Sequence, residues 1–130
     1  MEKLILYAPN SYHEATPKER AEVCNGCGAK GGIKFPDSMW GLDVKEACNI
    51  HDWMTKYGLT LMDFLFAAGM FIVNLTIIIW FGSSNKLTLT LRLMRATKYF
   101  VAVVVVGLNH FFKDKKRSDA KYISYRGSFQ

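Results

Sequence analysis

The fold is decided by residues 43–58, which read DVKEACNIHDWMTKYG. Asp43 is a favourable helix N-cap, the carboxylate of Glu46 follows three residues later, and no helix breaker occurs before Gly58. These residues therefore predict one uninterrupted helix with His51 and Asp52 in its middle. Adjacent helical residues project about 100° apart, so the two side chains face different directions and must do different work.

A glycine-rich segment lies one loop upstream of this helix, because residues 24–32 read CNGCGAKGG. Glycine accepts the backbone dihedrals that turn successive carbonyl oxygens toward one point. A carboxylate and such carbonyls supply the oxygen ligands of a hard cation like calcium, which needs about 6 to 8 of them, while an imidazole can accept a proton near neutral pH. We therefore expect a cation-dependent hydrolytic site, with the imidazole of His51 open to solvent and lipid beside the Asp52 carboxylate.

The chain resembles the phospholipase A2 family, whose signature is a Cys-Gly-x-Gly-Gly calcium loop followed by a helix that carries Cys-x-x-His-Asp. The likeness is strongest over residues 24–58. It implies that His51 is the catalytic base, that Asp52 is the calcium carboxylate, and that Cys27 and Cys48 form a disulfide between loop and helix. The remaining calcium ligands would be backbone carbonyl oxygens of the loop, namely those of Gly26, Gly28 and either Lys30 or Gly31.

The chain departs from the family's pattern in three places. Its loop is one residue longer than usual, which leaves the third carbonyl ligand undecided between Lys30 and Gly31. Thr55 stands where the family usually has a tyrosine. The aspartate that orients the histidine in the family has no clear counterpart, and we expect Ala68 to be the vacated position rather than Asp63 or Asn74, which lie in the same part of the chain. These departures predict that turnover is weak or lost.

The resemblance implies calcium-dependent hydrolysis of a glycerophospholipid acyl ester, the sn-2 ester by family analogy. In that reaction His51 takes a proton from the attacking water, and calcium on Asp52 polarises the ester carbonyl and stabilises the oxyanion. No covalent intermediate is required. The partner implied is a phospholipid membrane surface.

Two other interpretations remain open. Cys24-x-x-Cys27 and Cys48-x-x-His51 have the spacing of a structural zinc site in an interaction module, which would make His51 a ligand and leave Asp52 without a metal role. The glycine after Cys27 also occurs in many zinc knuckles, but zinc gives no reason for Gly31 and Gly32 or for Asp52 to follow the histidine. The second alternative is a membrane-associated protein without catalysis.

Three further helices are predicted outside the motif helix. Residues 16–19 form a capping box with proline at the first helical position, so a short helix leads toward Cys24. Thr60 caps a helix that runs to residue 80 or 81 and ends at residues 82–84. Residues 85–113 form a fourth element, which we expect to be helical although alternating leucines at its start resemble a strand. The fold class is therefore all-α, with two long antiparallel helices and a glycine-rich calcium loop.

The chain is expected to be one domain over its 130 residues, with a basic tail from about residue 113. Residues 64–81 approach the roughly 20 apolar residues needed to cross a bilayer, so a membrane-embedded helix stays open as an alternative. We expect instead a buried pair of helices, whose remaining apolar surface a second copy of the chain could cover in a homo-oligomer. A net charge of +6 without any recognition motif predicts no nucleic-acid partner. The apolar run at residues 4–8 is too short for a signal peptide, so we expect action inside a bacterial or viral setting, or export by another route. The expected site of action is a membrane surface.

Overall fold

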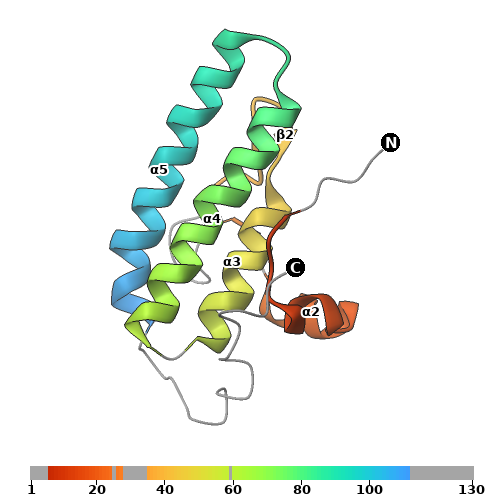
Figure 1. Cartoon of the computed structure of the whole chain (residues 1–130), viewed down its shortest axis with the longest axis vertical. Coiled ribbons are helices and arrows are strands. Elements are labelled where there is room, and N and C mark those ends of the chain that lie inside the picture. The colour runs from red at the N-terminus through yellow and green to blue at the C-terminus, as the bar shows by residue number, and fades with distance from the viewer. Residues whose placement is uncertain (1–5, 25, 28–34, 59, 112–130) are drawn as a thin grey trace.

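The computed structural model describes residues 6–24, 26–27, 35–58 and 60–111. A pair of two-residue antiparallel strands, β1 (Ser38–Met39) and β2 (Leu42–Asp43), precedes the motif helix. The small all-α domain expected from the sequence is confirmed (Figure 1). The helices are α1 (Asn10–Glu14), α2 (Pro17–Val23), α3 (Lys45–Tyr57), α4 (Leu61–Gly82) and α5 (Lys86–Phe111).

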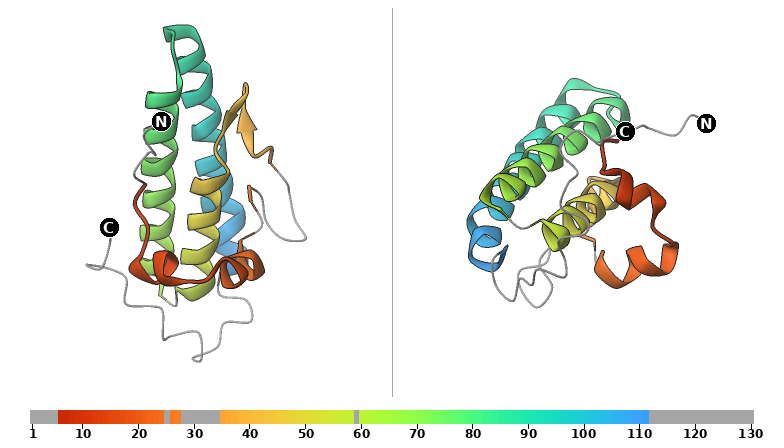
Figure 2. Two further views of the ribbon diagram at one scale, coloured as in Figure 1. Left: turned by 90° about the vertical axis from the view of Figure 1, so that its right-hand side faces the viewer. Right: turned by 60° about the horizontal axis from the view of Figure 1, so that its bottom comes forward.

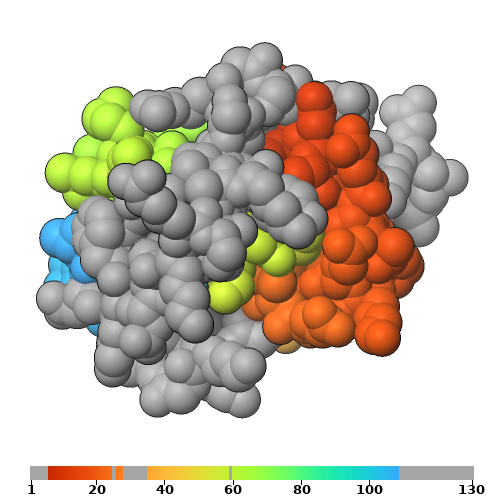
Figure 3. Space-filling view, turned by 90° about the horizontal axis from the view of Figure 1, so that it is seen from below, coloured from red at the N-terminus to blue at the C-terminus, as the bar shows by residue number. Residues whose placement is uncertain are grey.

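The two long helices, α4 and α5, form an antiparallel hairpin along the long axis of the molecule (Figure 1). Helix α3 packs along α4, so that α4 and α5 lie on one side of the domain and α1, α2 and α3 lie on the other (Figure 2). Seen from the end where α3 meets α4, the start of α4 and the end of α5 lie opposite α2 (Figure 3). Helix α3, which carries the motif, is therefore held between α2 and α4.

Two helix starts are fixed by capping boxes that the local sequence predicts. At α2, Thr16 Oγ1 accepts from the backbone N–H of Glu19 at 3.1 Å, and the Glu19 carboxylate accepts from the N–H of Thr16 at 2.9 Å. At α4, Thr60 and Asp63 make the same reciprocal pair of hydrogen bonds, each 3.1 Å long. Each box satisfies two N–H groups that have no partner within their helix, so these helices begin where the sequence indicates.

The start of α3 differs from the expectation. The cap position is Val44 rather than Asp43, because Asp43 belongs to β2 and pairs with Ser38. The Asp43 carboxylate still accepts a hydrogen bond, but from the N–H of Lys45, at 2.9 Å. The carboxylate of Glu46, expected to complete the cap, instead accepts from the hydroxyl of Tyr12 at 2.7 Å. A tertiary contact has taken the place of the local one.

Buried Arg92 on α5 joins two turns: the β-turn at Trp40 and Gly41, which connects β1 to β2, and the turn between α4 and α5. Its guanidinium donates to the backbone carbonyls of Met39 at 3.0 Å and Trp40 at 2.6 Å. It also donates to the carbonyl of Gly82 at 3.0 Å and to Ser83 Oγ at 2.9 Å. Trp40 has a positive φ of 46°, a strained value for a residue with a bulky side chain. Arg92 therefore holds this turn in a conformation that the local sequence does not favour.

Candidate active site

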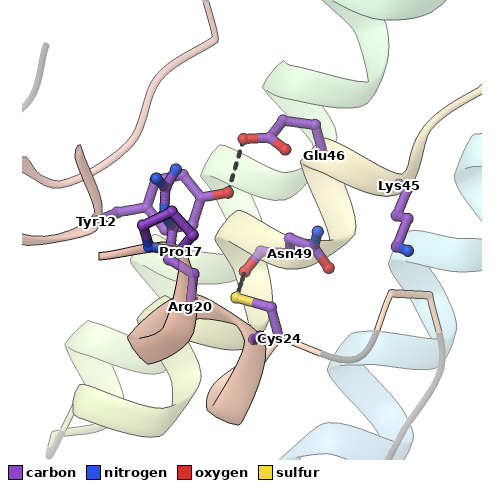
Figure 4. Close-up of a pocket in the computed structure, with 8 residues that line it drawn as sticks. Tyr12, Pro17, Arg20, Cys24, Lys45, Glu46 and Asn49 are labelled. Carbon is purple, nitrogen blue, oxygen red and sulfur yellow. Dashed lines mark hydrogen bonds between the residues drawn. The ribbon is translucent and has the colours of Figure 1, made fainter. Parts of the chain in front are cut away.

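A disulfide between Cys27 and Cys48 fastens the start of the glycine-rich segment to α3, with the two Cα atoms 5.0 Å apart. This is the pairing that the phospholipase A2 resemblance implies. Asn49 adds two contacts next to it: its side-chain oxygen accepts from the N–H of Gly26 at 3.0 Å, and its backbone carbonyl accepts from Cys24 Sγ at 3.2 Å (Figure 4). Asn49 lies one helical turn before Asp52, so the segment begins beside the motif.

Gly26 can be only glycine in this arrangement. Its φ is +77°, and a Cβ at this position would lie 2.7 Å from Oδ1 of Asp37. The same Asp37 oxygen accepts from the N–H of Cys27 at 2.8 Å. A carboxylate from the segment after the glycines is therefore packed directly against their first residues. Sequence reasoning missed Asp37 and Asn49; aspartate directly after Pro36 indicates a turn, but nothing in the sequence shows what that turn contacts.

Cys24 is the free cysteine, and its thiol is held in the protonated form. Burial is the main cause; the negative charges of Asp52 and Glu46 add to it and Arg20 partly opposes it, so that together they raise the pKa of Cys24 to about 12. The Asp52 carboxylate thus acts electrostatically on the Cys24 thiol, which precedes the glycine-rich segment. A carboxylate is a good ligand for a hard cation.

The imidazole of His51 packs against α4. Its ring centroid lies 4.9 Å from that of Phe71, and its Nε2 is buried with no hydrogen-bond partner among the described residues. Burial lowers the pKa of His51 to about 4, so the side chain is neutral at pH 7. The expectation of an imidazole open to solvent and lipid is therefore wrong for this edge of the ring, because α4 covers it.

No aspartate among the described residues is bonded to the buried Nε2 of His51. Ala68 is buried one turn before Phe71 on the same face of α4, and it has no polar atom to offer a histidine. The other two candidates have different tasks: Asp63 caps α4, and the Asn74 amide exchanges two hydrogen bonds of 2.8 Å with the backbone of Tyr7. These contacts support Ala68 as the vacated position.

Thr55, the other departure from the family pattern, directs its hydroxyl to the backbone of its own helix. Its hydroxyl donates to the backbone carbonyl of Asp52 at 3.0 Å, within α3. The hydroxyl is thus used by the helix itself. Among the residues that the structure describes, the buried Nε2 of His51 has no aspartate or tyrosine partner of the kind that the resemblance would supply.

A polar pocket of about 350 Å³ opens between α2 and α3 (Figure 4). The guanidinium of Arg20 lies over the ring of Tyr12, 5.3 Å from its centroid, and the Tyr12 hydroxyl donates to Glu46. Burial and the Glu46 carboxylate raise the pKa of Tyr12, so its hydroxyl stays protonated and can donate this hydrogen bond. The pocket is walled by Tyr12, Pro17, Arg20, Ala21, Cys24, Lys45, Glu46 and Asn49. Its charged lining suits polar groups rather than acyl chains.

The remaining site predictions fall in two groups. The carbonyls of Gly28, Lys30 and Gly31 lie outside the described residues, so their expected role as calcium ligands stays a prediction. The expected zinc site of Cys24, Cys27, Cys48 and His51 cannot form in the disulfide-bonded chain, because the sulfurs of Cys27 and Cys48 are bonded to each other. Within the described ranges, no three side chains of His, Cys, Asp or Glu converge as a metal site.

No protein-family model, curated protein or solved structure matches this chain. The candidate site therefore stands on its own residues: the bridge from Cys27 to Cys48, the contacts of Asn49 and the neighbouring pair His51 and Asp52. Their arrangement brings a neutral imidazole, a carboxylate and the start of a glycine-rich turn to the same part of α3.

Proposed function

We propose that the protein is a calcium-dependent hydrolase of glycerophospholipid acyl esters, of phospholipase A2 type. The observation that supports this most is the disulfide from Cys27 to Cys48, which joins residues 21 apart in the sequence. It brings the glycine-rich segment to the helix that carries His51 and Asp52.

The donor chemistry of the site fits calcium. Asp52 contributes a carboxylate. Gly26, the first glycine of the segment, has a positive φ, a conformation that lets a loop turn its carbonyl oxygens toward one point. In the oxidised chain, two of the thiolates that a zinc site would use, those of Cys27 and Cys48, are joined in the disulfide. Asp52 and loop carbonyls would hold the ion. Calcium bound there would supply Lewis-acid polarisation of the ester carbonyl and stabilisation of the oxyanion.

His51 would act as the general base toward water. Because the imidazole is neutral at pH 7, it can take the proton of the attacking water without first losing one. Phe71 fixes the plane of the ring by packing against it. No carboxylate at Ala68 stabilises the imidazolium that forms, and the protein environment disfavours that charge. We therefore expect slow turnover compared with a site that has such a partner.

The test is fatty-acid release from phosphatidylcholine and phosphatidylglycerol vesicles in calcium or in chelator. We expect release to need calcium, and His51→Ala and Asp52→Asn each to lower it at least ~100-fold, the lower end of what a general base contributes. His13→Ala is the matched control, since His13 is exposed on α1 and should leave the rate unchanged. The acidic limb of kcat/KM should lie nearer pH 4 than pH 6.5, because burial lowers the pKa of His51 to about 4. Equal release by the wild type and the His51→Ala protein would overturn the proposal.

A membrane-associated protein without catalysis is the second candidate. The alanine at position 68 and the threonine at position 55 favour it, because both remove groups that would support His51. In the same assay this candidate predicts vesicle binding without calcium-dependent release. The two candidates are therefore separated by one experiment.

A further inference from the structure

The outward side of α4 carries no charged residue along its whole length. Apart from Leu61 and Phe81 at its two ends, its exposed side chains recur at helical spacing and form a single stripe. By composition and length, α4 is also the one described helix that could cross a membrane. A helix on the surface of a soluble protein normally turns a polar face to water, and α4 has none. The members of this α4 stripe are Met62, Leu65, Val73, Thr76 and Trp80.

Helix α5 repeats the apolar pattern of α4 on one of its sides. Its other side is covered by residues 36–40. They are held there by Tyr99, whose hydroxyl donates to the carbonyl of Pro36 at 2.8 Å, and by Arg92, which donates to the carbonyl of Met39. The opposite, exposed side of α5 is apolar apart from its threonines, Lys86 and Lys98. The members of this α5 stripe are Leu87, Thr90, Met94, Thr97, Lys98, Val101, Val105 and Leu108. The α4–α5 hairpin thus has an apolar outer face made of two stripes.

The threonines on these stripes turn their hydroxyls back into the helices. Thr76 donates to the carbonyl of Ile72 at 2.7 Å, and Thr90 donates to that of Lys86 at 2.8 Å. Thr97 likewise donates to the carbonyl of Leu93 at 3.0 Å. In each case the hydroxyl is satisfied inside its own helix, four residues back. All three threonines can therefore enter an apolar environment without an unsatisfied donor.

We propose that this outer face lies flat in the interface of a phospholipid bilayer, with the rest of the domain on the aqueous side. In this orientation α3, with His51 and Asp52, lies on the side of the hairpin turned away from the bilayer, so this contact anchors the domain and does not itself present lipid to the candidate site. A crossing orientation is disfavoured by charge. Helix α3 packs along α4 and exposes Lys45, Glu46 and Lys56, which would enter the hydrocarbon if α4 spanned it. Lys98 would also lie deep in the bilayer. In the flat orientation these groups stay in water or at the headgroups.

The two lysines on the hairpin's outer side favour lipid over a second copy of the chain. Lys86 and Lys98 are exposed there, and across residues 61–111 the only acidic residue is Asp63, which is buried in the α4 cap. A symmetric protein interface on this face would bury the lysines without a carboxylate partner, at a considerable energetic cost. At a membrane, their long side chains reach the lipid phosphates while their stems remain among acyl chains.

One end of the hairpin also carries aromatic side chains with a cation, as membrane interfaces favour. Trp80 and Phe81 are exposed where α4 ends. Trp40 is exposed on the adjacent β-turn, and the guanidinium of Arg95 lies 4.5 Å from its ring centroid. Tryptophan and arginine are stable at the level of the headgroups. We expect this end to sit at that level.

The test is co-flotation of the full chain with two kinds of vesicle. One is phosphatidylcholine alone, and the other is phosphatidylcholine and phosphatidylglycerol at about 7:3, which supplies anionic headgroups for the lysines. We expect the wild type to float with both, more strongly with the anionic lipid, and Met94→Gln and Val101→Gln each to weaken partitioning at least ~10-fold. Tyr7→Gln is the matched control, because it removes an exposed apolar side chain outside the stripes. Circular dichroism confirms that each variant is folded.

Brominated lipid provides a second measurement in the same samples. It should quench the exposed Trp80 and Trp40, so the Trp80→Phe and Trp40→Phe proteins should each lose part of the quenching, while the buried Trp53 should contribute little. Absence of flotation, or equal flotation of the wild type and both stripe variants, would overturn the proposal. So would a stable dimer whose dissociation follows the stripe variants. Binding is read without turnover, so this inference and the hydrolase proposal can fail separately.

Discussion

The Cys27→Ser/Cys48→Ser protein is expected to lose about 3 kcal/mol of unfolding free energy and about 10 °C in Tm. The bridge closes a loop between residues 21 apart and restricts the unfolded chain. Its loss also frees Cys27 and its neighbour Gly26 from α3, leaving the contacts of Asn49 and Asp37 to hold them. Urea unfolding followed by circular dichroism measures the first effect, and calcium affinity measures the second.

Cys24→Ser is the control for this prediction. Cys24 is not in the bridge, and a serine can still donate to the carbonyl of Asn49, so the change should cost less than about 1 kcal/mol. A reducing agent should lower the stability of the wild type to that of the double variant and leave the double variant unchanged. Equal stability of the oxidised and reduced wild type would contradict the role given to the bridge.

Arg92→Met is expected to lower the unfolding free energy by about 3 kcal/mol or more. The change removes four hydrogen bonds and leaves the carbonyls of Met39 and Gly82 without the donor they use. The turn at Trp40, with its positive φ, loses the group that holds it. Thermal unfolding measures the loss, and the fluorescence of Trp40 should report a rearranged turn.

Arg92→Lys separates geometry from charge in this prediction. A lysine keeps the positive charge, but it cannot reach both turns with the fixed fork of a guanidinium. We therefore expect it to recover only part of the lost stability. Full recovery by lysine would show that the charge, rather than the joining of the two turns, is what matters.

The helices were predictable because their limits are set locally. Thr16 with Glu19, and Thr60 with Asp63, are three residues apart, so the sequence alone contains both partners of each cap. At α3 the prediction erred by one residue, because Asp43 pairs with Ser38 in the strand pair, and Glu46 binds Tyr12, 34 residues away, instead of completing a cap. The pattern of a capping box does not reveal such a competitor.

The candidate site was predictable only in its motif. The spacing of Cys48, His51 and Asp52 suggested a family, and the resemblance implied the bridge to Cys27. The burial of His51 could not be predicted, because it depends on how α4 presents Phe71 to α3. Arg92 was missed for the same reason, since two of its partners lie 52 and 53 residues away.

Calcium titration of the oxidised chain, by calorimetry in the presence of vesicles, tests the central claim that the glycine-rich segment and Asp52 share one ion. We expect one calcium ion per chain and at least a ~10-fold loss of affinity in Asp52→Asn, since the ion loses its carboxylate ligand. Asp43→Asn, an exposed change at the start of α3, should leave the affinity unchanged. No calcium binding, or one zinc ion held tightly by Cys24, Cys27, Cys48 and His51 in the reduced chain, would contradict the account.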